Sequence, residues 1–306
     1  MRHRLFDGAV RTAITLGAVL WVSSPTGAQA PTGAQMKKPR EVAGCPSTAA
    51  AFHACALAKA KTFNPPRTPD GQPDLQGLWE TPMAGGLGNI EGRRGADAES
   101  QTPPNSLVVD PANGLIPYHP WAREQKAENV DHYVDPYTHC LPITAPRIMA
   151  SPRTRQIAQY PGYLTIVNES GGHPFRVVYM DGRPHLPADI KLWRGDSRGR
   201  WEGNTLVIET TNLTGLAWFG SGGDFFSDAL KITERLTMVD ANTIHYAATL
   251  DDPKVSSRPW TMAFALERNK EKGYEQMEEG CFESDRDTAD LLLTGFKMYT
   301  GPRFPK

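Results

Sequence analysis

The sequence lacks the short motifs that would assign it to a common class of enzyme. It has no H-E-x-x-H zinc motif, no Walker phosphate-binding loop and no G-x-G-x-x-G dinucleotide fingerprint. These absences disfavour a zincin, a nucleotide hydrolase and a nicotinamide-dependent enzyme, so we expect no nucleotide cofactor. The sequence also has no internal repeat, which counts against a propeller.

An excess of charge is missing as well. The chain has 33 Lys and Arg residues against 34 Asp and Glu residues, a formal net charge of −1. Nucleic acids and anionic membrane surfaces attract proteins that carry basic patches. We therefore expect neither as a partner, and we predict a small-molecule ligand or substrate instead.

Beyond residue 30 no apolar run is long enough to span a membrane, so membrane insertion is not expected. Residues 1–30 have the parts of a cleavable signal peptide: a basic start, an apolar run over residues 13–22, and a small-x-small site at residues 28–30. The apolar run holds roughly ten residues, about half of what a bilayer core requires. We therefore predict a periplasmic or secreted protein, the alternative being an uncleaved membrane anchor.

Cysteine is scarce, with four residues, all of them after the predicted signal peptide. An even number of cysteines in an exported protein predicts two disulfides. Cys45 and Cys55 are the obvious local pair, which leaves Cys140 and Cys281 to join the first half of the fold to its C-terminal end. A metal site is the alternative, although no two cysteines have C-x-x-C spacing.

Glycine and proline, by contrast, are abundant, with 28 and 26 residues, which suits short strands and many turns. After the signal peptide we expect a flexible lead-in with a short helix over residues 31–66, followed by a single β-barrel domain over residues 67–306. The helix is predicted at the alanine-rich residues 48–62. Residues from about 64 to 122 are predicted mainly as long loops.

Alternation of apolar and polar side chains predicts a series of strands joined by tight turns. The strands are expected over residues 77–80, 163–167, 175–179, 205–210, 231–239, 243–250 and 260–266, with one more around 276–283. Because no helical pattern separates the later ones, they predict an antiparallel meander. Seven or eight such strands lose their exposed edges by closing on themselves. The expected fold is therefore all-β, a lipocalin-like barrel that can hold one small ligand.

Residues 173–204 are the densest in side chains that carry chemistry. His185 follows Asp181 by four residues around a turn, where the carboxylate can hydrogen-bond one imidazole nitrogen. Such a contact sets the tautomer of the imidazole and raises its basicity, as a general base requires. We predict His185 and Asp181 as the acid–base pair and His173 as a further catalytic residue.

No metal is predicted as a resident cofactor, but a divalent metal on His173, His185 and a carboxylate is an alternative. Its weakness is distance, because a straight strand would put His173 roughly 26 Å from Asp181.

Four further residues of this segment are predicted to bind substrate: Arg176, Arg183, Trp193 and Asp196. The arginines suit an anionic group, and tryptophans around a glycine-rich turn suit a ring or a sugar. The alternative is structural, with Trp193 and Trp201 covering one end of the barrel.

Two other features of the sequence are weaker candidates. Residues 195–199 match G-x-S-x-G, but no helix follows Ser197 as a nucleophile elbow requires, so a hairpin turn explains the glycines better. Asp181 and Gly182 likewise have the chemistry of a simple turn. His139 lies beside Cys140 and is a weaker site candidate.

Several motifs together resemble a family of exported bacterial proteins of unassigned function. They are PDLQGLWE at residues 73–80, CLP…PR at 140–147, DGRPH at 181–185, W-x-G-D-S-x-G-x-W-E-G-N-T-L-V-I-E-T at 193–210, SDAL…ER at 227–235 and DDP…RPWT at 251–261. Asn204 stands where the family commonly has aspartate. The resemblance covers nearly all of the chain after the signal peptide and implies a single domain and export. It supplies no reaction and no catalytic residues.

Together these features predict an exported enzyme that uses His/Asp acid–base chemistry on a small, partly apolar organic molecule. A lyase, an isomerase and a hydrolase all fit. The alternative is a non-catalytic periplasmic protein that binds such a molecule, and a third interpretation is a structural module of the envelope.

Overall fold

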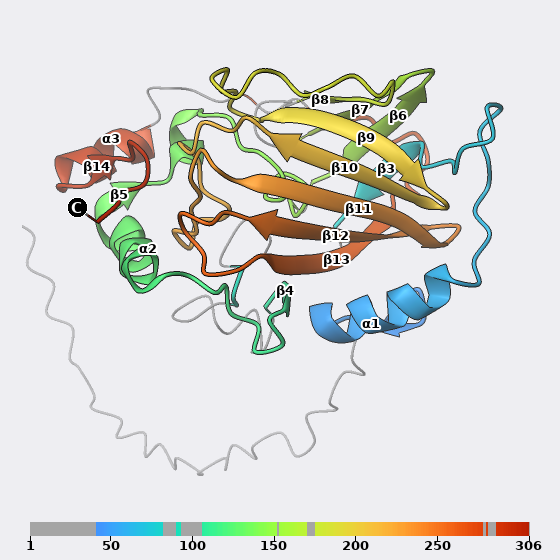
Figure 1. The fold of residues 1–306 in the computed structure, drawn as a ribbon, viewed down its shortest axis with the longest axis horizontal. Helices are drawn as coiled ribbons and strands as arrows, with labels where there is room; N and C mark the ends of the chain where they lie inside the picture. The colour runs from blue at the N-terminus through green and yellow to red at the C-terminus, as the bar shows by residue number, and fades with distance from the viewer. Residues whose placement is uncertain are drawn as a thin grey trace, which may run out of the picture. The chain divides into compact units, whose positions relative to one another are not determined.

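Strands with apolar inward-facing side chains build the main body of the structure. In the computed structural model, nine strands of the described residues pair edge to edge in a closed ring (Figure 1). They are β3 (Gly77–Glu80), β6 (Arg155–Tyr160), β7 (Tyr163–Asn168), β8 (Phe175–Tyr179), β9 (Asp196–Glu202), β10 (Thr205–Thr211), β11 (Lys231–Asp240), β12 (Thr243–Asp251) and β13 (Trp260–Arg268). The ring confirms the predicted all-β, lipocalin-like barrel, with more strands than the seven or eight expected.

The structure describes residues 41–81, 90–92, 106–151, 153–169, 175–277, 280 and 286–305. The predicted signal peptide, His173 and Cys281 lie outside these residues. Residues 39–306 belong to one compact unit. Among the helices described, none is long and apolar enough to cross a membrane.

Strand order around the ring follows the order of the chain, as a meander requires. The ring closes at β13, which pairs with β12 through Trp260 and Leu250 and with β3 through Glu267 and Glu80. Neighbouring strands are antiparallel except β8 and β9, which run in the same direction. β4 (Val108–Asp110) pairs with another part of β13.

The barrel interior is filled by side chains that alternate along each strand. On β12 the buried inward residues are Ile244, Tyr246, Ala248 and Leu250. Tyr246 packs on Phe264 of β13, with ring centroids 4.6 Å apart. Full burial of such a side chain contributes about 1.5–3 kcal/mol, so this packed interior is the main source of stability.

A helix lies against the outer face of the barrel. α1 (Ala49–Ala60) confirms the predicted helix and packs through Phe52 and Ala56 near β11, β12 and β13 (Figure 1). The short pair of β1 (Glu41–Val42) and β2 (Cys45–Pro46) precedes it.

Both cysteines near α1 are joined as predicted. Cys45 and Cys55 form a disulfide, with Cα atoms 5.8 Å apart. Cys140 is also disulfide-bonded. Because Cys281 lies outside the described residues, its pairing with Cys140 stays a prediction.

Smaller elements lie outside the ring. They are α2 (Pro120–His132), the 3-10 helix at Pro136–His139, α3 (Arg286–Leu293), and the parallel pair of β5 (Tyr133–Val134) and β14 (Lys297–Met298). The strand expected around residues 276–283 is not formed at Gln276, Met277 or Gly280, and the other residues of that segment are not described.

Candidate active site

The candidate site lies on residues 180–195, the crossover segment that joins β8 to β9. Because these two strands run parallel, the chain must return along the barrel before β9 begins. Gly182 and Gly195, with φ of 76° and 72°, turn the chain near the two ends of the segment. A side chain at Gly195 would also collide with the carbonyl oxygen of Thr211, only 2.6 Å from a Cβ placed there.

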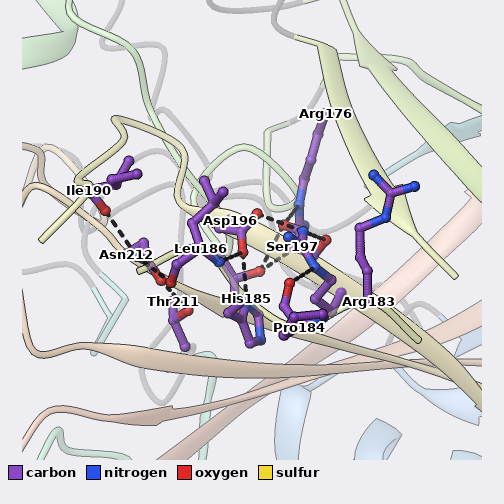
Figure 2. A network of polar contacts seen from close by, with 12 residues as sticks. Arg176, Arg183, Pro184, His185, Leu186, Ile190, Asp196, Ser197, Thr211 and Asn212 are labelled. Atoms are coloured by element: carbon purple, nitrogen blue, oxygen red, sulfur yellow. Dashed lines mark hydrogen bonds and ion pairs between the residues drawn. The ribbon is translucent and has the colours of Figure 1, made fainter. Parts of the chain in front are cut away.

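His185 of the crossover segment contacts Asp196, the first residue of β9 (Figure 2). Its Nδ1 lies 2.9 Å from Oδ2 of the carboxylate. A carboxylate accepts hydrogen bonds, so this contact favours the tautomer in which Nδ1 carries the proton; in that neutral tautomer Nε2 has the lone pair. The side chain of His185 is 27% exposed and that of Asp196 is 7% exposed. The pair therefore combines a fixed carboxylate with an imidazole that solvent can reach.

The carboxylate of Asp196 is held from two other sides. The backbone N–H of Leu186 donates to Oδ2 over 3.0 Å, and Nη1 of Arg198 donates to Oδ1 over 2.6 Å. Arg198 also donates from Nε to the carbonyl of Pro184. These bonds set the direction from which Asp196 meets His185.

Asn212, just after β10, holds the crossover segment in place. Its Nδ2 lies 2.7 Å from the carbonyl oxygen of Pro187, 2.9 Å from that of Ile190 and 3.3 Å from that of Leu186 (Figure 2). Its backbone is left-handed, with φ of 61°, a conformation that asparagine tolerates better than most residues. Asn212 thus fixes the loop that carries His185.

A pocket of about 550 Å³ lies beside His185 at this end of the barrel. The crossover segment forms one wall, and the end of β10, the start of β11 and the end of β12 form the others. Apolar side chains of Leu186, Ala188, Leu230 and Pro253 contribute to the lining. The size and lining suit a small, partly apolar molecule.

Charged side chains complete the pocket lining. Lys191 donates to the backbone carbonyl of Asp228, and Lys254 donates to the Asp228 carboxylate over 2.7 Å. The hydrogen bond from Lys254 lowers the pKa of Asp228 below its ordinary value. Lys231, also in the lining, forms no ion pair with the described residues. The pocket therefore offers cationic and anionic contacts beside its apolar walls.

Asp181, the predicted partner of His185, is engaged elsewhere. Arg183 donates to its carboxylate from Nε over 2.9 Å and from Nη2 over 2.5 Å. The hydrogen bond from Arg183 lowers the pKa of Asp181, and the guanidinium lies 4.1 Å from the ring centroid of Tyr179. The predicted Asp181–His185 pair is therefore wrong, because Asp181 closes its own turn while Asp196 reaches His185 from β9. Arg183 is half-exposed on that turn and does not line the pocket.

Arg176 lies inside the barrel and not in a substrate pocket near His185. It forms an ion pair with Glu234 of β11, and it donates from Nε to Ser197 over 2.9 Å and from Nη2 to Thr210 over 2.7 Å. Burial alone would lower the pKa of Arg176, but the Glu234 carboxylate outweighs burial and raises it. The Ser197 hydroxyl belongs to this network, which agrees with a structural reading of the G-x-S-x-G match.

The remaining predicted residues do not join the site. Trp193 is partly buried on the crossover segment and does not line the pocket, and His173 lies outside the described residues. Within the part of the chain that the structure describes, no three His, Cys, Asp or Glu side chains are grouped to hold a metal ion. His139 is buried, and burial lowers its pKa.

Sequence reasoning missed Arg198 and Asn212 as positioning residues. Asn212 carries one local signal, since an asparagine that ends a run of β-branched residues suits a left-handed position. Arg198 carries none, because its role depends on where Asp196 and Pro184 meet in space.

Comparisons with known proteins assign the chain to no family. No family model matches the chain, and no curated relative matches it. A crystal structure of a point mutant of the fluorescent protein UnaG is 14% identical, with 64% of this chain and 97% of that chain covered and a TM-score of 0.27. Wild-type UnaG is 15% identical, with 45% and 90% covered and a TM-score of 0.24. A likeness of this size says nothing about a ligand or an activity.

Proposed function

We propose that the protein is an enzyme in which His185, oriented by Asp196, acts as a general acid–base on a small, partly apolar organic molecule. The observation that carries the proposal is the 2.9 Å contact between Nδ1 and the carboxylate, made beside a pocket of about 550 Å³. The contact leaves Nε2 as the nitrogen that can exchange a proton with a bound molecule.

The proton balance of this arrangement is simple. Nε2 accepts a proton from a C–H, O–H or water O–H bond of the reactants, and the Asp196 carboxylate stabilises the resulting imidazolium. The same imidazolium then returns the proton to a leaving group or to another atom of the substrate. Lyase, isomerase and hydrolase reactions all share these two steps.

The pocket lining supports the proposed substrate class. Leu230, Ala188 and Pro253 offer apolar contact, while Lys191 and Lys231 offer ammonium groups to an anionic or oxyanionic part of the molecule. A substrate with one apolar part and one anionic part would contact the apolar side chains with the first and the ammonium groups with the second.

A structural role for the pair is the main competitor, because the His185–Asp196 contact also ties the crossover segment to β9. Turnover separates the two roles. We would incubate extracts of small metabolites with wild-type protein and with His185→Ala, and follow all masses by untargeted mass spectrometry. The matched control is His132→Ala, which removes an exposed histidine at the end of α2.

We expect a product that forms with wild type and His132→Ala and falls about 100- to 10,000-fold with His185→Ala. Asp196→Asn should lower the same rate strongly, since it removes the charge that stabilises the imidazolium. Equal product formation by folded His185→Ala and wild type would contradict the proposal.

A second candidate function is binding without turnover. Leu186, Ile190 and Leu192 of the crossover segment are 37%, 41% and 37% exposed, which suits contact with an apolar ligand. In the same experiment a compound that co-purifies with the protein and remains unchanged would favour this function.

We also propose that the protein is exported. The signal-peptide pattern of residues 1–30 supports this proposal, as does the Cys45–Cys55 disulfide, since disulfides persist mainly outside the reducing cytosol. Cell fractionation and N-terminal mass spectrometry should find a cleaved protein that starts near residue 31. An intact N-terminus in the cytoplasmic fraction would contradict export.

A further inference from the structure

A second hollow lies near the other end of β9 from Asp196. It is a groove of about 570 Å³ between the loop at residues 68–76, the turn that joins β6 to β7, and the part of β9 at Arg200 and Trp201. We call it the aromatic groove. It shares no lining residue with the pocket beside His185.

Three aromatic rings line the aromatic groove. Tyr160 and Tyr163 face each other across the end of the β6–β7 hairpin, with ring centroids 4.9 Å apart and planes 18° from parallel. They remain 48% and 38% exposed, which is a large apolar area to leave in water. Trp201 is partly buried against the core. The rings therefore present a surface on which the apolar face of a flat or ring-shaped molecule can pack.

Several polar groups of the groove have no hydrogen-bond partner among the residues that the structure describes. The side-chain amides of Gln72 and Gln76 and the indole N–H of Trp201 make no hydrogen bond with the described residues. An amide offers both donors and acceptors, and the indole offers a donor. Their positions beside the rings suit a ligand with hydroxyl groups around its edge.

The charges of the groove are mostly compensated. Arg200 lies 2.9 Å from a carboxylate oxygen of Glu202 and 2.7 Å from one of Glu209. Asp70 accepts a hydrogen bond from the Thr68 hydroxyl over 2.5 Å and is the one carboxylate among the described residues of the lining. Of the lining residues that the structure describes, no cation is left unpaired for an anionic ligand. A quaternary ammonium ligand would need rings on several sides, whereas Tyr160 and Tyr163 lie nearly parallel.

We propose that the aromatic groove is a binding site for an uncharged sugar ring, as a monosaccharide unit or part of an oligosaccharide. A pyranose has an apolar C–H face for the aromatic rings and a rim of hydroxyls for Gln72, Gln76 and Asp70. The proposal is independent of the proposed function, since no residue of the groove takes part in it.

Saturation-transfer NMR tests the proposal with maltotriose, cellotriose and triacetylchitotriose at millimolar concentration, and with choline and indole as comparison probes. At least one trisaccharide should bind wild type, and Tyr160→Ala should weaken that binding about tenfold. Gln76→Ala, an exposed position that should not disturb folding, should weaken it several-fold.

Two controls make the outcome specific. Phe175→Ala removes an aromatic side chain that is 64% exposed and lies outside the groove, so sugar binding should not change. His185→Ala should also keep it, which separates this site from the proposed active site. The proposal is overturned if no trisaccharide binds, if only choline or indole binds, or if folded Tyr160→Ala and Gln76→Ala bind as well as wild type.

Discussion

Two adjacent residues of β9, Asp196 and Ser197, belong to polar networks on opposite faces of the barrel wall. Asp196 contacts His185 on the outside (Figure 2). Ser197 contacts Arg176, which forms an ion pair with Glu234 inside the barrel. Neighbouring residues of a strand point to opposite faces, so one strand supplies both networks.

The two networks differ in whether their polar groups are all buried and bonded within the protein. Inside, Glu234 accepts from Arg176 and also from the hydroxyl of Tyr246 over 2.8 Å, and burial followed by the Glu234 charge raises the pKa of Tyr246 well above its ordinary value. Outside, His185 is bonded to Asp196 through Nδ1, and its side chain is among those that line the pocket. The polar groups of the inner network are bonded to one another and buried, whereas the outer network includes an imidazole that is 27% exposed and lines a pocket.

The largest expected effect comes from breaking the inner network. Glu234→Ala leaves the Arg176 charge in a site where the two side chains are 7% and 0% exposed, and should lower the free energy of unfolding by about 3–5 kcal/mol. Denaturant unfolding measures it. The double variant Arg176→Met with Glu234→Leu should recover most of the loss, because it buries no unpaired charge. A loss below about 1 kcal/mol for Glu234→Ala would contradict this account of the inner network.

The outer network can be loosened without touching His185. Asn212→Ala removes three hydrogen bonds to the crossover segment and puts alanine in a left-handed conformation, and should cost about 1–3 kcal/mol of unfolding free energy. Asn212→Gly removes the bonds alone and should cost less. Denaturant unfolding of both variants separates the two contributions. Equal stability of wild type and both variants would show that Asn212 does not hold the segment.

A third network, between α1 and β12, should make stability depend on pH. His53 Nδ1 lies 2.9 Å from His245 Nε2, and burial, followed by the charge of His53, lowers the pKa of His245 to about 3. Burial also lowers the pKa of His53. Folding thus favours the neutral form of both histidines, whose ordinary pKa is 6.5. The contribution of His245 to the free energy of unfolding is complete above about pH 6.5 and is lost as the pH falls toward 3.

From about pH 6.5 to pH 5 we expect a loss of about 1–2 kcal/mol attributable to His245. His139, whose pKa burial also lowers, contributes in the same direction, so the measurement is the difference between wild type and His245→Gln across the pH series. Parallel curves for the two proteins would show that His245 does not titrate with unfolding.

The smallest effect is expected at the surface ion pair of Arg183 and Asp181, two residues to which the sequence analysis assigned separate site roles. Arg183 and Asp181 are both exposed, so water and salt screen their attraction. Arg183→Ala should therefore leave the unfolding midpoint and any turnover unchanged. If it abolished turnover as His185→Ala does, the assignment of the site to Asp196 would need revision.

Much of the fold was predictable because its strands repeat a simple pattern. The alternation in residues 231–250 gave β11 and β12 almost residue for residue. α2 was missed because its buried side chains include the polar Gln125, Lys126 and Asn129, which show no apolar stripe in the sequence. β6 was missed for a similar reason, as it begins with Arg155, a charged residue that is fully buried.

The site was harder to predict because its partners are not neighbours in the sequence. His185 and Asp196 are 11 residues apart and meet only because the crossover segment returns along the barrel. Arg176 and Glu234 are 58 residues apart, and the direction of Arg176 could not be told from its own strand. The local sequence pattern therefore predicted which residue types are present, but the contacts between them depend on strand pairing over long distances in the sequence.

The crossover segment and β9 contribute different parts of the candidate site. The segment carries the imidazole and one wall of the pocket, whereas the carboxylate that orients the imidazole belongs to β9. Residues 180–195 and the first residue of β9 therefore supply the two members of the His185–Asp196 pair separately. An exchange of this segment that kept Asp196 would change one wall of the pocket without altering any residue of the strands that pair in the ring.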